Sequence, residues 1–261
     1  MPKQKNWFLS RAARPLQLLY SLYAILLFLV MMVPVFLFSV LASLTGVIRG
    51  GNLILKACAF WGDVWFPLVG IFHRTIYEQR PRDGEAYIFV ANHISWLDAA
   101  MAPKAFRQPM RPLGRIETTK VPVFGFIYKR CIVSVDRSDA AHRSRSVQRL
   151  KSVLRKGISI LVFPEGTFNE TGKPLAPFFD GAFRIAIETG TPIKPVLLLD
   201  MYDRMPYNVP FSLNPGRSRA VYLEEIPVAG MTVEDVPRLR DQVYAAMEAK
   251  LSEYRASWIA D

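Results

Sequence analysis

The chain has 261 residues, enough to bury a core without a metal or a disulfide framework. Its two cysteines, Cys58 and Cys131, form no Cys-x-x-Cys pair and no disulfide framework, which favours a reducing compartment. Half of the residues are apolar and the mean hydropathy is +0.16, which excludes a disordered chain and suggests membrane contact. The net charge of +11 is typical of proteins that bind nucleic acid or another anion.

The first predicted element is a long apolar helix. No charged residue occurs between Arg14 and Arg49, and residues 18–38 are almost continuously apolar, which predicts a segment inserted in a membrane. A signal peptide fits less well, because its apolar region spans only about 7–15 residues. One helix over the whole uncharged stretch would measure about 50 Å, more than the bilayer core, and Pro34 is a place where it can kink.

A second apolar stretch covers residues 53–72, but it contains Lys56 and Asp63 and is rich in tryptophan. Charges among such aromatic residues indicate a helix that lies in the membrane interface or returns through it. The basic N-terminus and a later basic segment both favour the cytoplasmic side, so we expect two passes or a re-entrant hairpin. We therefore predict membrane-anchoring helices over residues 1–72 and a catalytic-type α/β domain over residues 73–261.

From about Arg74 onward, short apolar strands alternate with amphipathic helices, which predicts an α/β fold with a mixed, largely parallel sheet covered by helices. The predicted strands are residues 87–91, 131–135, 159–163, 195–199 and 220–223, and the predicted helices are residues 139–156, 178–189 and 233–258.

The whole excess of positive charge lies between Lys104 and Lys156, where 14 basic residues face three acidic ones. A localised basic segment indicates an anionic partner: a phosphate, a membrane surface, a nucleotide or an acidic protein. The segment lacks the stacking aromatic residues and the recognition-helix layout of nucleic-acid binders, so we expect no nucleic-acid partner.

The first candidate site follows the strand at residues 87–91. His93 leaves that strand and Asp98 stands five residues later, so the carboxylate can orient the imidazole and stabilise it as a general base. A structural role is an alternative, since Ser95 and Asp98 have the spacing of a helix capping box. His73 and His142 have no neighbours at metal-ligand spacing, so we expect no metal site.

The second candidate site, residues 163–167 (Phe-Pro-Glu-Gly-Thr), follows another predicted strand. Ligands of α/β proteins bind at the carboxyl ends of the strands, where Glu165 can bond a hydroxyl and Gly166 allows a close approach. A simple turn is the alternative reading.

Taken together, four blocks in this order resemble the glycerolipid acyltransferase family, and within it the 1-acylglycerol-3-phosphate (lysophosphatidic acid) acyltransferases. The blocks are residues 92–98, residues 115–125 continuing to 135–137, residues 163–167 and residues 178–196. The resemblance implies that family's fold and an enzyme of phospholipid synthesis at a membrane. It places the enzyme at the cytoplasmic face of a bacterial inner membrane.

The resemblance implies that His93 deprotonates the acceptor hydroxyl and that Asp98 orients His93 and stabilises its charge. The alkoxide then attacks an acyl thioester, acyl-CoA or acyl-carrier protein, which is a co-substrate, so no cofactor is expected. No serine or cysteine nucleophile is expected, because Ser95 is better explained as a helix cap.

By the same resemblance, Glu165, Gly166 and Thr167 hold the glycerol phosphate part of lysophosphatidic acid. Arg115 and Arg137 are candidate ligands of its phosphate, and Lys120 is a further one.

The sequence departs from the family at Phe168, where an arginine that binds phosphate is usual. Lys173 or Arg184 can supply the missing charge, or the acceptor is another lysolipid, such as a lyso-aminolipid. A non-catalytic basic protein of the membrane surface is the remaining alternative.

Overall fold

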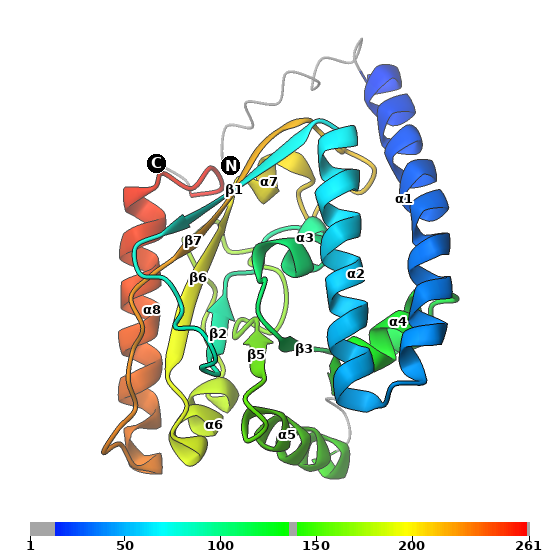
Figure 1. Cartoon of the computed structure of the whole chain (residues 1–261). Helices are drawn as coiled ribbons and strands as arrows, with labels where there is room; N and C mark the ends of the chain where they lie inside the picture. The colour runs from blue at the N-terminus through cyan, green and yellow to red at the C-terminus, as the bar shows by residue number, and fades with distance from the viewer. Residues whose placement is uncertain (1–13, 136–139, 260–261) are drawn as a thin grey trace.

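The computed structural model describes residues 14–135 and 140–259, and it contains a seven-stranded sheet with helices on both faces (Figure 1). The strand order is β1-β7-β6-β2-β5-β3-β4. The strands are β1 (Ile71–Tyr77), β2 (Ile88–Ala91), β3 (Met110–Arg115), β4 (Val133–Val135), β5 (Ser159–Val162), β6 (Ile193–Leu199) and β7 (Gly216–Tyr222). This arrangement confirms the predicted mixed sheet.

Five of the strands, β2 to β6, run parallel, so their carboxyl ends meet at one edge of the sheet. Strand β7 is antiparallel to β6, and β1 pairs in parallel with β7. Strands β2, β5 and β6 are buried along their whole length, which explains their continuous apolar sequences.

The helices are α1 (Arg14–Ser43), α2 (Val47–Leu68), α3 (Leu97–Ala105), α4 (Phe124–Cys131), α5 (Ala140–Leu154), α6 (Gly181–Thr189), α7 (Met201–Arg204) and α8 (Val236–Glu253), with short 3-10 turns η2 (Ile116–Lys120) and η3 (Val233–Asp235). From β2 through β3 to β4 the chain moves toward one edge of the sheet, and from β4 through β5 to β6 it moves back. With right-handed crossovers, α3 and α4 therefore lie on one face of the sheet and α5 and α6 on the other. Helix α2 packs against α3 and α4, and α8 against α6.

Several predicted boundaries were wrong. Strands β1 and β3 were not predicted, because β1 contains polar residues such as His73 and β3 contains Pro112 and Gly114. Cys131 ends helix α4 and does not begin a strand, and the last helix stops at Glu253.

Helices α1 and α2 form an antiparallel hairpin beside the sheet (Figure 1). Helix α1 continues through Pro34, and it is the one helix of the described residues that is long and apolar enough to cross a membrane. Its outer face exposes large apolar side chains, among them Leu22, Leu26 and Leu29. Trp61 and Trp65 of α2 are buried within the protein, and the Trp65 indole N–H donates to the Ala24 carbonyl at 3.1 Å.

Candidate active site

The histidine and the aspartate of the first block meet at the carboxyl end of β2. His93 follows that strand, Asp98 lies in the first turn of α3, and His93 Nδ1 is 2.9 Å from Asp98 Oδ2. The carboxylate is fully buried, and the same oxygen accepts the backbone N–H groups of Ile94 and Ser95, both at 2.8 Å. With its proton on Nδ1, the imidazole keeps Nε2 for accepting a proton from a substrate.

The capping role left open by the sequence is present in part. Asp98 accepts the Ser95 N–H as the acidic residue of a capping box does. The Ser95 hydroxyl accepts the Leu97 N–H at 3.1 Å and donates to the Met205 carbonyl at 2.6 Å, whereas Trp96 occupies the N-cap position of α3 without a side-chain capping bond. One carboxylate therefore orients the imidazole and also fixes the turn that carries it.

Glu165 lies next to this turn, but its carboxylate contacts backbone. Its side chain is 3% exposed; one oxygen accepts the His93 N–H and the other the Ala176 N–H, each at 2.8 Å. Burial raises its pKa to about 7. Gly166 adopts a left-handed conformation, with φ of +75°, and Thr167 is exposed. Sequence reasoning missed this link, because nothing in the local pattern points from Glu165 to the backbone of His93.

Aromatic rings surround the imidazole. The centroid of the Phe163 ring lies 4.4 Å from that of His93 in a stacked arrangement, and that of Phe168 lies 4.3 Å away. Phe168 also contacts Trp96, at 4.9 Å, and Tyr207, at 5.9 Å. The residue that replaces the family's arginine therefore covers the proposed base with a neutral ring.

The structure does not bring the predicted phosphate ligands into contact with the base. Arg115 ends β3 and is exposed, with Nε 3.6 Å from Glu117 Oε2, and Lys120 ends η2 and is exposed. Arg137 lies outside the described residues. The proposed substitutes, Lys173 and Arg184, are also exposed, and Arg184 belongs to α6 on the other face of the sheet.

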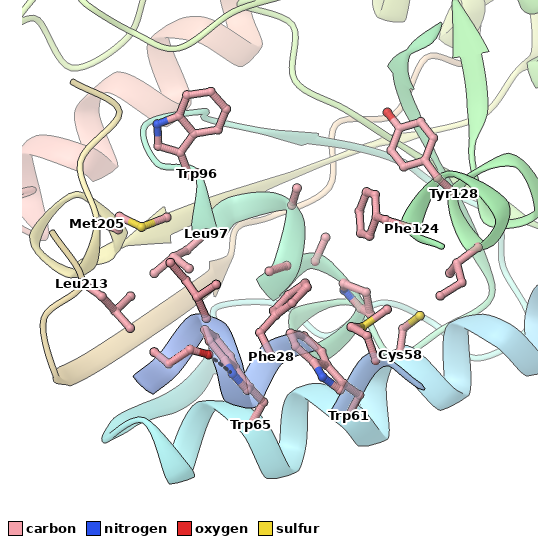
Figure 2. Close-up of a pocket in the computed structure, with 18 of the residues that line it drawn as sticks. Phe28, Cys58, Trp61, Trp65, Trp96, Leu97, Phe124, Tyr128, Met205 and Leu213 are labelled. Atoms are coloured by element: carbon pink, nitrogen blue, oxygen red, sulfur yellow. Dashed lines mark hydrogen bonds between the residues drawn. The ribbon is translucent and has the colours of Figure 1, made fainter. Parts of the chain in front are cut away.

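An apolar cavity of about 560 Å³ opens beside the site (Figure 2). It is enclosed by α1, α2, α3, α4 and the loop after α7, through residues that include Phe28, Cys58, Trp61, Trp65, Leu97, Ala100, Phe124, Ile127, Met205 and Leu213. Trp96 lines this cavity and also contacts Phe168, which contacts His93, so only these two aromatic side chains separate this wall of the cavity from the imidazole. No sequence signal marked the cavity, because its walls come from distant parts of the chain.

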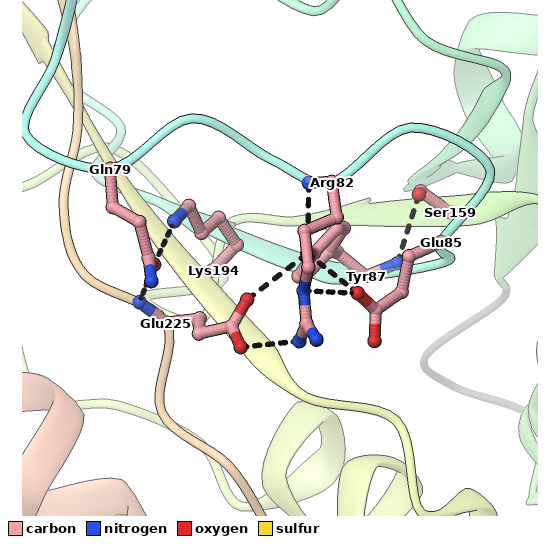
Figure 3. Close-up of polar contacts among 7 residues, drawn as sticks. All are labelled: Gln79, Arg82, Glu85, Tyr87, Ser159, Lys194 and Glu225. Carbon is pink, nitrogen blue, oxygen red and sulfur yellow. Dashed lines mark hydrogen bonds and ion pairs between the residues drawn. The ribbon is translucent and has the colours of Figure 1, made fainter.

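The strand that carries His93 is held at both ends. At its carboxyl end, the buried Asn92 amide accepts the Leu198 N–H at 2.8 Å and donates to the Leu198 carbonyl at 3.1 Å, which fastens β2 to β6. At its amino end, the Tyr87 hydroxyl contacts Arg82 and Glu225 (Figure 3). The base therefore sits on a rigid strand.

The same network at the amino end includes a fully buried lysine. Lys194 Nζ of β6 donates to Gln79 Oε1, which also accepts the Glu225 N–H at 2.7 Å (Figure 3). Burial lowers the pKa of Lys194. These bonds tie the segment before β2 to β6 and to the segment after β7, at the edge of the sheet opposite the His93 site.

The arrangement favours direct transfer between two substrates. Burial raises the pKa of the Cys131 thiol, and the Ser95 hydroxyl donates to a backbone carbonyl, so neither is a prepared nucleophile. Among the side chains that the structure describes, no three of the types His, Cys, Asp or Glu form a metal-binding group. A histidine base held by a buried carboxylate beside an apolar cavity suits an acyltransferase whose substrate carries an apolar chain.

The comparisons agree with this class. The acyltransferase family model matches residues 73–199. The 1-acyl-sn-glycerol-3-phosphate acyltransferase of Salmonella typhimurium is 30% identical over 203 residues, which cover 76% of this chain and 81% of the relative. The enzyme of the same name from Escherichia coli K12 is 29% identical over the same shares. The chain belongs to the acyltransferase family, which confirms the resemblance found in the sequence.

The fold is also that of a solved member. The crystal structure of the 1-acyl-sn-glycerophosphate (LPA) acyltransferase PlsC from Thermotoga maritima superposes with a TM-score of 0.76 at 23% identity. The match covers 93% of this chain and 98% of that one, so it includes the α1–α2 hairpin as well as the sheet.

Proposed function

We propose that the protein transfers a fatty acyl group from an acyl thioester to the sn-2 hydroxyl of lysophosphatidic acid, giving phosphatidic acid for phospholipid synthesis. The observation that carries the proposal is the His93–Asp98 pair at 2.9 Å beside an apolar cavity. The relatives from Salmonella typhimurium and Escherichia coli, both 1-acyl-sn-glycerol-3-phosphate acyltransferases, support lysophosphatidic acid as the acceptor.

In the proposed reaction, His93 Nε2 takes the proton of the acceptor hydroxyl as its oxygen attacks the thioester carbonyl. The buried Asp98 carboxylate stabilises the imidazolium that forms. The tetrahedral intermediate then collapses, the carbon–sulfur bond breaks, and the thiolate takes the proton from the imidazolium. The acyl group becomes an ester, and the thiol of CoA or carrier protein leaves.

The cavity is the proposed place of a fatty acyl chain. Its volume of about 560 Å³ and its apolar walls suit a lipid tail, since ligand pockets measure about 300–1,000 Å³. The exposed apolar face of α1 supports a location at a membrane, where lysolipid and product reside. We propose the cytoplasmic face of a bacterial inner membrane, with the basic segment toward anionic lipid and donor.

Another lysolipid is the second candidate acceptor, and Phe168 is the observation that favours it. Its ring lies 4.3 Å from that of His93, where a phosphate monoester would need a cation. A Phe168→Arg substitution should raise kcat/KM for lysophosphatidic acid relative to a lyso-aminolipid by about 10- to 100-fold, since a hydrogen bond to a charged group contributes about 1.5–3 kcal/mol. An unchanged ratio would show that position 168 does not select the acceptor.

The proposed function is tested with the full-length protein in detergent, using lysophosphatidic acid, lysophosphatidylethanolamine and a lyso-aminolipid, each with palmitoyl-CoA and palmitoyl-carrier protein. We expect turnover with lysophosphatidic acid and its loss in His93→Ala, while the exposed Gln242→Ala control on α8 stays active and both variants bind membranes. Turnover only with another acceptor supports the second candidate. No turnover with any pair, together with salt-sensitive binding to anionic vesicles, indicates a non-catalytic membrane protein.

A further inference from the structure

The loop after β5 holds the backbone of the catalytic base through a carboxylate. Glu165 accepts the N–H of His93 with one oxygen and the N–H of Ala176 with the other, each at 2.8 Å. On its other side, the His93 carbonyl accepts the Asn169 N–H at 2.8 Å. The main chain of His93 is therefore fixed on both sides by residues 165–169, whereas Asp98 fixes its imidazole.

The carboxylate suits this task only when it is ionised. Both partners of the Glu165 carboxylate are N–H donors, and an ionised carboxylate presents only acceptors to them. A protonated carboxyl carries an O–H, which points a second donor at one of the two N–H groups. The groups that face Glu165 are the His93 and Ala176 N–H groups, the Asp98 carboxylate and the Tyr244 side chain of α8. Neither of the two side chains is a cation.

Burial sets the cost of that charge. The environment raises the pKa of Glu165 to about 7, first through desolvation and also through the charge of Asp98, while the two N–H groups act in the opposite direction. Glu165 therefore gains and loses its proton near neutral pH.

We propose that Glu165 is a positioning residue for the catalytic base: its ionised carboxylate clamps the backbone of His93 to that of Ala176, and uptake of one proton releases the clamp. This role rests on the proposed acyl transfer by His93, and it replaces direct contact with glycerol phosphate. Loss of the clamp moves the base, and a displacement of about 1 Å near a reacting group can cost about 100-fold in rate.

The kinetic test compares Glu165→Gln with Glu170→Gln, an exposed carboxylate on the same loop, in the full-length protein in detergent. With lysophosphatidic acid and palmitoyl-CoA we expect kcat to fall about 100-fold in Glu165→Gln, while KM for the acceptor changes less than about threefold. On the acid side of the pH profile, the plot of log kcat against pH should become less steep by one unit, because one titrating group has been removed. The Glu170→Gln variant should match the wild type. A raised acceptor KM with kcat retained would mean that Glu165 binds substrate, and the proposal would be wrong.

A second measurement needs neither activity nor a variant. Amide hydrogen exchange of the wild-type protein is followed at pH 5.5 and 8, corrected for intrinsic rates and resolved to single amides. We expect the protection of the His93 and Ala176 amides to fall at the lower pH, while the amides of β5 stay unchanged. Equal protection at both values would overturn the clamp. If the enzyme turns over no lysolipid but this exchange shift occurs, the proposed function fails and the clamp stands.

Discussion

At the scale of single residues, the Asp98 carboxylate both orients the His93 imidazole and fixes the turn that carries it. One of its oxygens accepts three N–H donors, from the His93 ring and from the Ile94 and Ser95 backbones, and the other has no hydrogen-bond partner among the described residues. A buried carboxylate that has one oxygen without a partner is stabilised by an imidazolium beside it.

Replacement of Asp98 by Asn should therefore lower kcat by roughly 10³- to 10⁴-fold, because the neutral amide does not stabilise the imidazolium. KM and the thermal unfolding temperature should change little by comparison. Steady-state kinetics and a thermal scan of the detergent-solubilised variant measure these quantities. A loss of activity below tenfold would contradict the role of Asp98.

Glu165 also predicts how stability depends on pH. The pKa of Glu165 is about 7 in the folded protein and 4.5 without the folded environment. Between these pH values the folded protein therefore holds a proton on Glu165 that the unfolded chain has lost. Its contribution to the free energy of unfolding is thus fully present below pH 4.5 and is lost as the pH rises through 7, on the order of 3 kcal/mol.

The measurement is urea unfolding of wild type and Glu165→Gln between pH 5 and 8. Because the amide does not titrate, the variant should lack this decline, and its stability relative to the wild type should rise with pH. A difference that stays constant over this range would show that Glu165 keeps its ordinary pKa.

At the scale of elements, the four helices α1 to α4 enclose a cavity that no one of them forms alone. Helix α3 lines it with small side chains, including Ala99, Ala100 and Ala102, and its neighbour α2 contributes Trp61 and Trp65. The space beside α3 therefore depends on alanines that leave room for a ligand.

An Ala100→Leu substitution should fill part of this space. We expect kcat/KM with palmitoyl-CoA to fall about tenfold relative to that with octanoyl-CoA, since each buried methylene of a chain contributes about 0.8 kcal/mol and the longer chain loses more contacts. Competition between the two donors gives the ratio directly. The exposed Ala245→Leu on α8 is the matched control, and equal losses for both donors would place the acyl chain elsewhere.

At the scale of the whole molecule, one side of the protein is an apolar ridge formed by α1. Leu22, Leu26 and Leu29 are each more than half exposed and share one face of that helix, while its other face packs on α2. Such a large apolar surface is typical of contact with lipid.

A Leu22→Glu/Leu29→Glu double variant should reduce membrane binding, because a charge inserted among lipid tails costs about 2.5–3.5 kcal/mol per residue. Flotation with anionic vesicles should show a loss of at least tenfold in the bound fraction relative to Leu22→Ala/Leu29→Ala. Activity on lysolipid in detergent micelles should persist, because neither residue lines the cavity. Unchanged flotation would mean that another surface holds the membrane.

Local sequence patterns predicted much of the fold and of the candidate site. The strand before His93 and the spacing from His93 to Asp98 are one local pattern, and strand β5 with the Phe163–Thr167 turn is a second. Because parallel strands end at the same edge of a sheet, it could be predicted that the turns carrying His93 and Glu165 lie close together. The uncharged stretch after Arg14 predicted helix α1 in the same way, because a long apolar run has few other structures open to it.

Tertiary packing decided the rest. The sequence of β1 is as polar as that of a loop, and the segment forms a strand because it pairs with β7, more than a hundred residues away. The cavity collects side chains from residue 21 to residue 213, and Glu165 becomes a buried clamp because Ala176 and His93 both turn their N–H groups toward it. Residue type and spacing show which groups can do chemistry, but burial and hydrogen-bond partners depend on contacts between distant segments, and those exist only in the folded chain.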